Sequence, residues 1–407
     1  MQQTKKPELL APAGGWEQLE YAIRFGADAV YLACDKFGMR ARACNFSLEE
    51  IPQVVAYAHE RGVDVHVTCN IVMHEHDFEE LEHYLTALAA ARVDALIIGD
   101  LGALRVARRV APNVAIHVST QASVSNAEAA LMWYELGAKR IVCARELSLA
   151  DIAAMRAKLP ADLELEAFAH GAMCMAYSGR CLISDYTTGR SALRGHCAQS
   201  CRWSYALVEE KRPGEYYGVE EDDNGSYIMN AQDMNMLAHV HEMAAAGIDS
   251  IKIEGRNKKA YYVATVVNAY RQVLDGADAA DFAAELETVS HRPYGTGFYF
   301  GPAHQTHGSI DYIRQWEWAA EVKSCEPADG GYRCELRCRN RFEIGATMEL
   351  MSPHKPVQPV ELCDMEFIGG KEDEEPFPAD VANRTNELYR ATSSVALAPH
   401  DIIRVKR

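Results

Sequence analysis

Eight short apolar runs recur between residues 8 and 254, and amphipathic stretches lie between them. The runs are Glu8–Pro12, Ala29–Cys34, Asp64–Cys69, Ala95–Gly99, Ala115–Ser119, Arg140–Ala144, Leu163–Ala169 and Ser250–Glu254. Each run has the composition of a buried strand, whereas EQLEYAIRFG, LEEIPQVVAYAHERG, FEELEHYLTALAAARV and NAEAALMWYELG have helical periodicity. Buried strands that alternate with helices every 20–35 residues or so predict βα units and a parallel sheet.

Eight such units predict an α/β fold in which the strands close into a (β/α)8, TIM-like barrel. An open, doubly wound sheet is the alternative. The barrel is favoured because APAGG, which follows the first run, is not the G-x-G-x-x-G fingerprint of a dinucleotide-binding sheet. Gly26, Gly62 and Gly137 stand where helix C-caps are expected, and residues 227–230 are a candidate additional strand.

The regular spacing breaks between Phe168 and Ser250, where about 80 residues replace one helix, far beyond an ordinary connection. We therefore predict a barrel domain over residues 1–300 with a cysteine-rich insertion at 171–248. From residue 312 onward, alternating runs such as YRCELRCRN, TMELMS and DIIRVKR are separated by Gly, Pro and Asp turns. They predict a small all-β domain over residues 312–407.

Charge and cysteine content narrow the classes of function. A net charge of −17 argues against non-specific nucleic-acid binding by the whole surface, although a local basic face is still compatible with it. No run of about 18 apolar residues and no signal-peptide pattern occur, so we expect a cytoplasmic protein without a membrane span. Its twelve cysteines are then expected to be free thiols or ligands. The isolated ones are expected to be small buried hydrophobes: Cys34, Cys44, Cys69, Cys143, Cys325 and Cys363.

Four other cysteines, Cys174, Cys181, Cys197 and Cys201, have the spacing C-x6-C-x15-C-x3-C within a Gly- and Ser-rich stretch. Thiolate sulfur is the ligand that iron–sulfur clusters and zinc prefer. Structural zinc usually pairs its ligands as C-x2–4-C, and only the second pair here is that tight. The spacing favours an iron–sulfur cluster over zinc; four unrelated cysteines or a disulfide pair remain the alternatives.

Several long motifs resemble one family. HGAMCMAYSGRCLIS followed by GHCAQSCRW is similar to the signature of the collagenase-like peptidase family 32 of the unassigned peptidases. ELLAPAG, IKIEGR with YYVATVVNAYR after it, SHRPYGTGF, RNRFEIG and the terminal HDIIRVK match in order. The resemblance therefore covers nearly the whole chain.

The resemblance implies an oxygen-independent hydroxylase. Better-understood members carry a 4Fe–4S cluster on four cysteines and take prephenate as the apparent source of the hydroxyl oxygen. One branch makes 5-hydroxyuridine at the tRNA wobble position, another hydroxylates a cytidine of 23S ribosomal RNA, and a shorter pair serves ubiquinone biosynthesis. GHCAQSCRWSY, IMNAQDMNML and the short β domain are most similar to the tRNA branch.

By the same resemblance, Cys174, Cys181 and Cys197 are cluster ligands. Some relatives have another cysteine where this chain has Asn235, and Cys201 is therefore assigned as the fourth ligand here. The resemblance also implies tRNA and prephenate as partners, together with iron–sulfur delivery machinery.

Polar residues at the predicted strand ends are the candidates for substrate chemistry, because barrel enzymes keep their chemistry at that face. Arginine forks bind carboxylates, so Arg256, Arg40 and Arg42 are candidate anchors for prephenate. His117, Gln121 and Asn70 are further candidate substrate-binding residues. His170, Glu254 and Lys252 are candidate catalytic residues for moving protons. For each residue taken singly, a purely structural role is the competing interpretation.

RNA binding would use the arginines near the cysteines, Lys258, Lys259, and the aromatic residues Trp203 and Tyr205 as a stacking shelf. Two other classes of function compete with RNA hydroxylation. A collagenase-like peptidase would need a nucleophile–base pair, but no H-E-x-x-H or G-x-S-x-G motif occurs. The other competing class is a zinc-stabilised scaffold or RNA-binding module without catalysis. Within RNA hydroxylation, ribosomal RNA is the rival substrate.

Overall fold

A computed structural model describes residues 6–39, 45–173, 181–203, 206–208, 216–218, 230–303, 305–306, 315–369 and 375–407. The chain divides into two compact units. The first comprises residues 1–283 and 291–312, and the second comprises residues 284–290 and 313–407. No helix among the described residues is long and apolar enough to cross a membrane.

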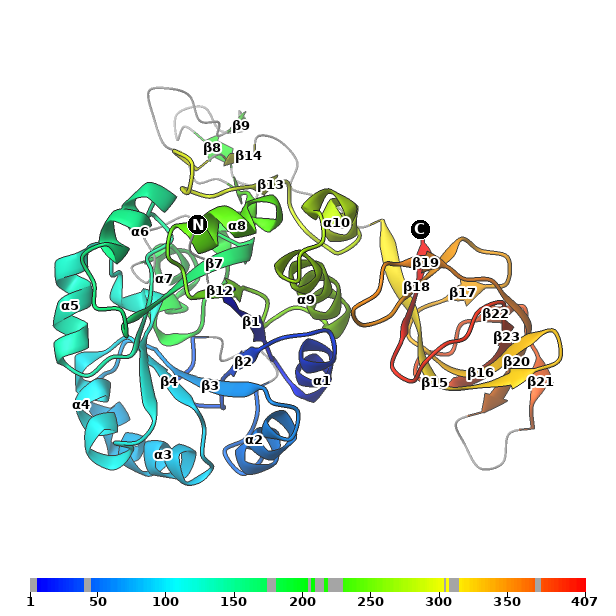
Figure 1. Ribbon diagram of the computed structural model, residues 1–407, viewed down its shortest axis with the longest axis horizontal. Coiled ribbons are helices and arrows are strands. Elements are labelled where there is room, and N and C mark those ends of the chain that lie inside the picture. The colour runs from blue at the N-terminus through cyan, green and yellow to red at the C-terminus, as the bar shows by residue number, and fades with distance from the viewer. Residues whose placement is uncertain are drawn as a thin grey trace. The chain divides into compact units, whose positions relative to one another are not determined.

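The first unit is a closed barrel of eight parallel strands ringed by helices (Figure 1). Pairing runs from strand to strand around the ring, and the last strand pairs with both the first and the seventh. The strands are β1 (Glu8–Pro12), β2 (Ala29–Leu32), β3 (Asp64–Cys69), β4 (Ala95–Ile98), β5 (Ala115–Val118), β6 (Arg140–Val142), β7 (Glu164–Ala172) and β12 (Ser250–Ile253). The prediction of a (β/α)8 barrel is confirmed.

The barrel helix α9 (Ala260–Leu274) is buried along almost its whole length, whereas the other barrel helices bury one face and expose the opposite one. These others are α1 (Trp16–Arg24), α2 (Ile51–His59), α3 (Phe78–Ala90), α4 (Leu101–Val110), α5 (Ala127–Glu135), α6 (Leu149–Arg156) and α8 (Val240–Ala245). Gly26, Gly62 and Gly137 follow α1, α2 and α5 with φ of 105°, 71° and 94°. Because left-handed backbone favours glycine, these residues end the helices as predicted.

The narrow interior of the barrel is polar at its base. The Arg140 guanidinium contacts the carboxylates of Glu8 at 2.6 and 2.9 Å, Glu164 at 2.7 Å and Glu166 at 3.2 Å. The Lys252 ammonium donates to Glu166 at 2.8 Å. Apolar side chains on neighbouring strands cover this network: Leu10, Ala29, Tyr31 and Ile97. Arg140 therefore contacts three carboxylates at the base of the barrel, of which Glu166 is fully buried while Glu164 stays 37% exposed.

Between β7 and β12 the chain leaves the barrel and returns to it. The excursion contains the helices α7 (Ile183–Thr188), η3 (Ala192–Arg194), η4 (Ser200–Arg202) and η5 (Leu237–His239). Its strands are β8 (Ala206–Val208), β9 (Tyr216–Gly218), β10 (Asn230–Ala231) and β11 (Asp233–Asn235). β11 pairs antiparallel with the end of β7, and β13 (Tyr294–Gly295) extends this edge. β10 pairs with β14 (Gln305–Thr306), so residue 230 of the predicted extra strand is in a strand, while residues 227–229 lie outside the described part.

The second unit is a mostly antiparallel β structure, as the alternating runs predict. Its strands are β15 (Trp316–Ala328), β16 (Gly331–Cys338), β17 (Phe342–Glu343), β18 (Met348–Met351), β19 (Gln358–Pro359), β20 (Leu362–Gly369), β21 (Phe377–Pro378), β22 (Val381–Ala382), β23 (Leu388–Ser393) and β24 (Ile402–Lys406). Eight of them form one sheet in the order β19-β18-β24-β15-β16-β23-β20-β21. α10 (Ala279–Leu286) enters this unit with its last turn.

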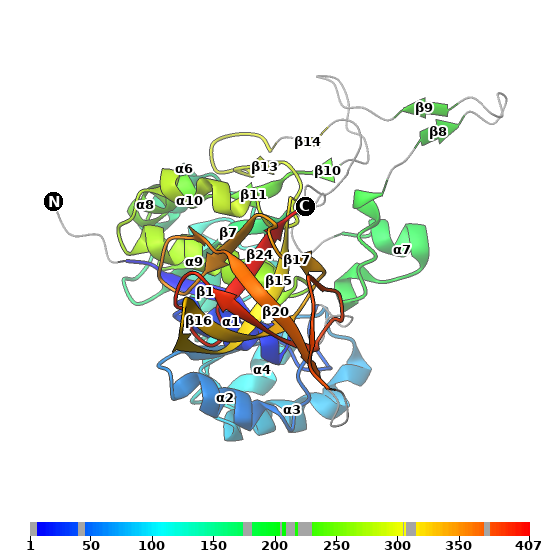
Figure 2. The same cartoon turned by 90° about the vertical axis from the view of Figure 1, so that its right-hand side faces the viewer.

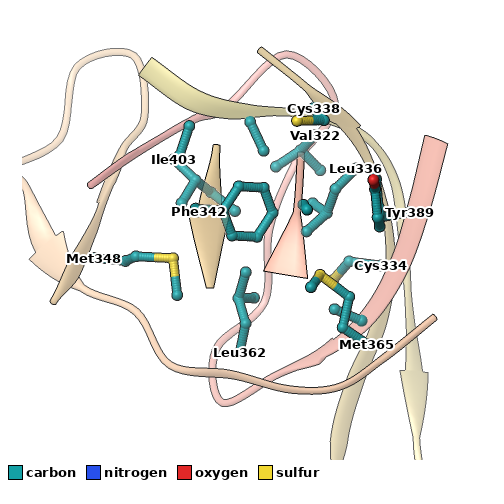
Figure 3. Close-up of a cluster of buried hydrophobic side chains, with 14 of the residues drawn as sticks. Val322, Cys334, Leu336, Cys338, Phe342, Met348, Leu362, Met365, Tyr389 and Ile403 are labelled. Carbon is teal, nitrogen blue, oxygen red and sulfur yellow. The ribbon is translucent and has the colours of Figure 1, made fainter. Parts of the chain in front are cut away.

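A single apolar cluster fills the second unit, and Phe342 lies at its centre between Leu336, Met348 and Leu362 (Figure 3). Beside the cluster, the buried Arg404 side chain bonds Glu285 at 2.7 and 2.9 Å and Glu349 at 2.8 Å. The unit therefore has its own core and its own buried ion pairs.

The isolated cysteines follow the prediction only in part. Cys34, Cys69 and Cys143 are buried, and burial raises the pKa of Cys34 to about 11 and that of Cys143 to about 12. The prediction is wrong for Cys363, which is exposed, and for Cys325, which forms a disulfide with Cys334. These two residues face each other on β15 and β16, a register that spacing along the chain does not reveal. Cys44 lies outside the described residues.

Candidate active site at the carboxyl ends of the barrel strands

Residues 181–203, called the cysteine segment below, carry Cys181, Cys197 and Cys201. This segment lies at the carboxyl ends of the barrel strands. Figure 2 shows α7 to one side of the barrel, away from the ring of helices. The Val72 amide, beyond β3, donates to Leu193 O at 3.0 Å, and the Arg194 guanidinium donates to Val72 O at 2.9 Å. A Cβ on Gly195 would lie 2.7 Å from Gly38 O, beyond β2. The segment is thus fastened to the loops that follow β2 and β3.

A buried serine organises the segment internally. Ser184 Oγ donates to Arg190 O at 2.7 Å and accepts from the Ala198 amide at 2.8 Å. The Arg190 guanidinium donates to Cys197 O at 3.2 Å. Both ends of α7 are therefore held close to the Cys197 turn.

Three of the four predicted cluster ligands, Cys181, Cys197 and Cys201, lie in this segment and are partly exposed. Cys174 lies outside the described residues. The Gln199 amide donates to Cys197 Sγ at 3.4 Å, the kind of contact that tunes a sulfur ligand of an iron–sulfur cluster. Within the described part of the chain, no three His, Cys, Asp or Glu side chains are grouped so that they could hold a metal ion. The donor chemistry fits a thiolate-bound cluster, although the described residues do not by themselves assemble its site.

A bidentate ion pair fastens the segment to the barrel. Arg194 donates to the two carboxylate oxygens of Asp77 at 2.8 and 2.9 Å. The Arg194 hydrogen bond, opposed by burial, lowers the pKa of Asp77 from 3.8 to about 2. Because the folded-state pKa is depressed, the pair stabilises docking fully above pH 4 or so, and the stabilisation is lost as pH falls towards 2.

We expect Asp77→Asn to weaken this docking by about 1–2 kcal/mol, since the neutral amide keeps one acceptor but loses the charge. Hydrogen exchange at the Val72 amide should become faster in the variant, and its rate between pH 5 and pH 3 should change less than in the wild type. Glu82→Gln, which alters an exposed ion pair with Arg109, is the control. Equal exchange of Val72 in Asp77→Asn and wild type would show that the pair does not fasten the segment.

Some predicted substrate-binding residues meet at the barrel mouth. Asn70 Nδ2, after β3, donates to Ser119 Oγ, after β5, at 3.1 Å. Gln121 follows Ser119, and its Oε1 is buried without a hydrogen-bond partner among the described residues. Asn70 and Gln121 therefore place amide groups at neighbouring positions of the same rim.

His117 lies deeper. Its ring contacts the His66 ring inside the barrel, with centroids 4.7 Å apart, and burial lowers the pKa of His117 well below its usual value. His117 is thus a neutral side chain of the barrel interior.

Arg256 is buried just beyond β12, where its Nη1 donates to Thr68 Oγ1 at 3.2 Å. A Cβ on Gly14 would lie 2.1 Å from Arg256 O, so only glycine permits this approach of the loops after β1 and β12. Arg40 and Arg42, the other predicted anchors, lie outside the described residues.

The three candidate catalytic side chains have different neighbours. The Lys252 ammonium binds Glu166 and lies 4.2 Å from the centre of the Tyr31 ring, inside the barrel. Glu254 lies at the mouth, where its Oε2 is 3.6 Å from the Arg145 guanidinium. His170 packs among the rings listed here: Tyr262, Tyr270 and Tyr294. Burial lowers the pKa of His170 to about 3, so its imidazole is neutral at physiological pH.

Sequence reasoning missed Arg145. Its guanidinium donates to Ala172 O at 2.8 Å, lies 3.8 Å from the Phe168 ring centroid and is only 7% exposed. The signal was present, because Arg145 directly follows a predicted strand in VCARE, as the other candidates follow theirs.

Some candidate RNA-binding side chains already contact other residues of the protein, whereas others are exposed. Arg194 is committed to Asp77, and Lys258 lies over the Tyr262 ring at 5.0 Å. Lys259 is exposed, and Trp203 is 47% exposed beside the cysteine turn. Tyr205 lies outside the described residues. Trp203 therefore remains the described candidate for a base-stacking surface.

Comparison with known proteins gives matches along both units. Over 359 residues the chain is 44% identical to "tRNA hydroxylation protein P1" of Bacillus subtilis, covering 86% of this chain and 84% of that one. It is 33% identical over 399 residues to "tRNA hydroxylation protein P" of Escherichia coli, covering 86% of each chain. "23S rRNA 5-hydroxycytidine C2501 synthase" of Escherichia coli is 39% identical over 268 residues, covering 66% of this chain and 39% of that one.

Two family descriptions match in succession. Residues 14–309 match peptidase family U32, and residues 314–404 match the peptidase family U32 C-terminal domain. The first match covers the barrel from α1 onward together with the cysteine segment, and the second covers most of the β unit. With these matches and the identity to full-length relatives, the chain belongs to peptidase family U32.

Proposed function

We propose that this protein is an enzyme that hydroxylates tRNA, forming 5-hydroxyuridine at the wobble position. The observation that carries the proposal is the 44% identity, over most of both chains, to a protein named for tRNA hydroxylation. The finer parts of the proposal are the position on the tRNA, a 4Fe–4S cluster and prephenate as hydroxyl donor. These rest on the family resemblance and on the chemistry of the site.

Cys174, Cys181, Cys197 and Cys201 would hold the cluster, which supplies electron transfer or Lewis-acid chemistry when bound. The protein's own part is to position the thiols. Ser184 and Arg190 shape the Cys197 turn, and the pair of Arg194 with Asp77 fixes the segment over the strand ends. The cluster would thereby lie on the face where barrel enzymes bind their substrates.

The mouth of the barrel would bind both prephenate and the nucleobase that is to be hydroxylated. Arg256, Asn70 and Gln121 offer donors and acceptors there, and Glu254 is the partly exposed carboxylate that can accept a proton. His170 is neutral, so it serves as an acceptor rather than as an acid at physiological pH. Lys252 pairs with Glu166 and orders the floor of the site.

Binding to tRNA has to be local, since the chain as a whole is acidic. Exposed Trp203 beside the cysteine turn offers an aromatic face for an unstacked uridine. Lys259, exposed at the start of α9, offers a phosphate contact.

Complementation tests the proposal. The gene would be expressed in an Escherichia coli strain that lacks tRNA hydroxylation protein P, with cells grown without oxygen because the proposed reaction does not use it. Mass spectrometry of tRNA nucleosides should then show restored 5-hydroxyuridine. Restoration of 5-hydroxycytidine in 23S ribosomal RNA, in a strain lacking that synthase, would favour the rival substrate instead.

A peptidase activity, which the family name suggests, has less support. The sequence has no H-E-x-x-H or G-x-S-x-G motif, and burial raises the pKa of Cys34 and Cys143 far above the range of nucleophilic thiols. Digestion of gelatin by the purified protein, lost on substitution of a single Ser or Cys, would be needed to favour it.

A further inference from the structure

Arg145 is a buried cation whose hydrogen-bonding capacity is only partly used. A guanidinium presents five N–H donors in a planar fork. One donates to Ala172 O at 2.8 Å, and the nearest carboxylate oxygen, on Glu254, is 3.6 Å away, beyond hydrogen-bond distance. Arg145 Nε is buried and has no hydrogen-bond partner among the described residues. A buried N–H group normally has a hydrogen-bond acceptor, because leaving the hydrogen bond unmade costs free energy.

The position of Arg145 shows where that acceptor would come from. Its guanidinium stacks on the Phe168 ring, and the Lys252 ammonium lies 5.7 Å from the centre of the same ring. Phe168 and Lys252 are register partners on β7 and β12, and Lys252 points into the barrel towards Glu166. Arg145 therefore lies on the floor of the mouth, with a second cation beneath it.

A buried acceptor complements this donor on the next strand. Gln121 follows β5, which is the hydrogen-bonded neighbour of β6, and its Oε1 is also buried without a partner in the described part of the chain. Thr120 Oγ1 donates to Cys143 O at 3.2 Å, so the loop carrying Gln121 contacts the strand end that carries Arg145. One rim thus presents an unfilled donor and an unfilled acceptor.

The chemistry of the Arg145 guanidinium and the Gln121 amide oxygen indicates which kind of ligand they can bind. A guanidinium fork recognises a carboxylate through charge-assisted hydrogen bonds, and an amide oxygen accepts from a hydroxyl. An RNA phosphate could supply the negative charge, but a backbone phosphate contacts exposed side chains, whereas Arg145 is 93% buried. A small acid, unlike a backbone phosphate, can be enclosed by buried groups.

We infer that Arg145 is the carboxylate-binding residue of the barrel mouth and that Gln121 receives the hydroxyl of the same small hydroxy acid. Only the identity of that acid rests on the proposed function, in which prephenate, a hydroxylated dicarboxylic acid, is the donor. The site itself rests on the two buried, unfilled groups.

Calorimetric titration of the anaerobically purified full chain tests the inference with two probes, prephenate and L-malate. We expect Arg145→Gln to weaken binding of the preferred acid about 30-fold or more, because the charged fork is lost. Arg145→Lys keeps the charge without the fork and should weaken it about 5- to 10-fold. Arg109→Gln, on the exposed face of α4, should bind as the wild type does.

The probes separate failure of the inference from failure of the proposed function. Unchanged binding of both acids by Arg145→Gln and by Arg145→Lys overturns the inference, provided that the variants melt as the wild type does. Binding of malate that depends on Arg145, without any binding of prephenate, supports the site and removes prephenate from the proposed function. If neither acid binds to the wild type, the hydroxy-acid site is rejected.

Discussion

Cys197→Ala is expected to abolish both cluster binding and tRNA hydroxylation. Cys197 lies in the described part of the segment, where its carbonyl accepts from the Arg190 guanidinium and its sulfur accepts from the Gln199 backbone amide. Alanine retains the backbone contact and removes only the sulfur ligand, so the loss should be chemical rather than structural. Iron and sulfide per chain should fall to roughly a tenth of the wild-type content or less, since a thiolate ligand supplies a large share of cluster affinity.

Cys363→Ala is the matched control, because Cys363 is an exposed cysteine on β20 of the other unit. It should retain full iron content and full 5-hydroxyuridine formation. Cys201→Ala and Asn235→Ala then identify the fourth ligand. Asn235 Oδ1 already accepts from the Leu237 amide at 3.1 Å, so its substitution should leave iron content unchanged. A Cys197→Ala protein that keeps four irons per chain would refute the assignment of this ligand.

Arg140→Met is expected to cause the largest loss of stability. Methionine fills much of the same space but leaves Glu8, Glu164 and Glu166 without their shared cation at the base of the barrel. Removing one partner of a buried ion pair typically costs about 3–5 kcal/mol. Glu8 loses its main cation in this variant, and Glu166 keeps only its contact with Lys252. Scanning calorimetry should show the transition of the barrel at a markedly lower temperature. Arg109→Met, at an exposed ion pair, should cost less than about 1 kcal/mol.

The pH dependence of stability is a second test of the Arg140→Met prediction. In the wild type, burial raises the pKa of Glu8 while the Arg140 hydrogen bond lowers it, and the net direction is down. A depressed pKa stabilises the fold above the unfolded-state pKa and loses that effect as pH falls. Without Arg140, burial is opposed only by the weaker effects of His66 and the Ser250 hydrogen bond, so the pKa of Glu8 should rise and the variant should gain stability on mild acidification. A variant that melts like the wild type at every pH would show that the network contributes little.

The sequence predicts the barrel well because each βα unit can be recognised from residues that are close together in the chain. The first and third strands, Glu8–Pro12 and Asp64–Cys69, have the predicted bounds, and most others differ by one to three residues at an end. Glycines after α1, α2 and α5 end their helices as expected. Apolar runs, amphipathic stretches and C-cap glycines are all short-range features, and they suffice for this fold.

The sequence predicts less of the site, because the direction of a side chain at a strand end depends on register. The pairing of β7 with β12 shifts between Lys252 and Ile253, so that Ile253 lies opposite His170. Beyond this irregularity, simple alternation no longer tells which side chain faces the barrel. His170 therefore packs among tyrosines of α9 and β13, while Lys252 points into the barrel.

The sequence also does not show which charged side chains are buried or which residues they pair with. Arg194, taken from the sequence as one of several arginines available to RNA, is committed to Asp77, 117 residues away. Arg145, which sequence reasoning passed over, is buried at the barrel mouth, and its Nε has no hydrogen-bond partner among the described residues. Both assignments depend on which loops meet at the barrel mouth.

The excursion between β7 and β12 begins and ends on strands that are hydrogen-bonded to each other. Pairing of β7 with β12 therefore does not depend on the length of the chain between Ala172 and β11, the strand on which the chain returns to the barrel. Evolution can lengthen, shorten or exchange this part of the chain while the barrel stays shut, because loops tolerate insertions that framework strands do not. A chimera that carries the excursion of a relative with a different RNA target should fold, and it offers a direct route to transplanting substrate choice.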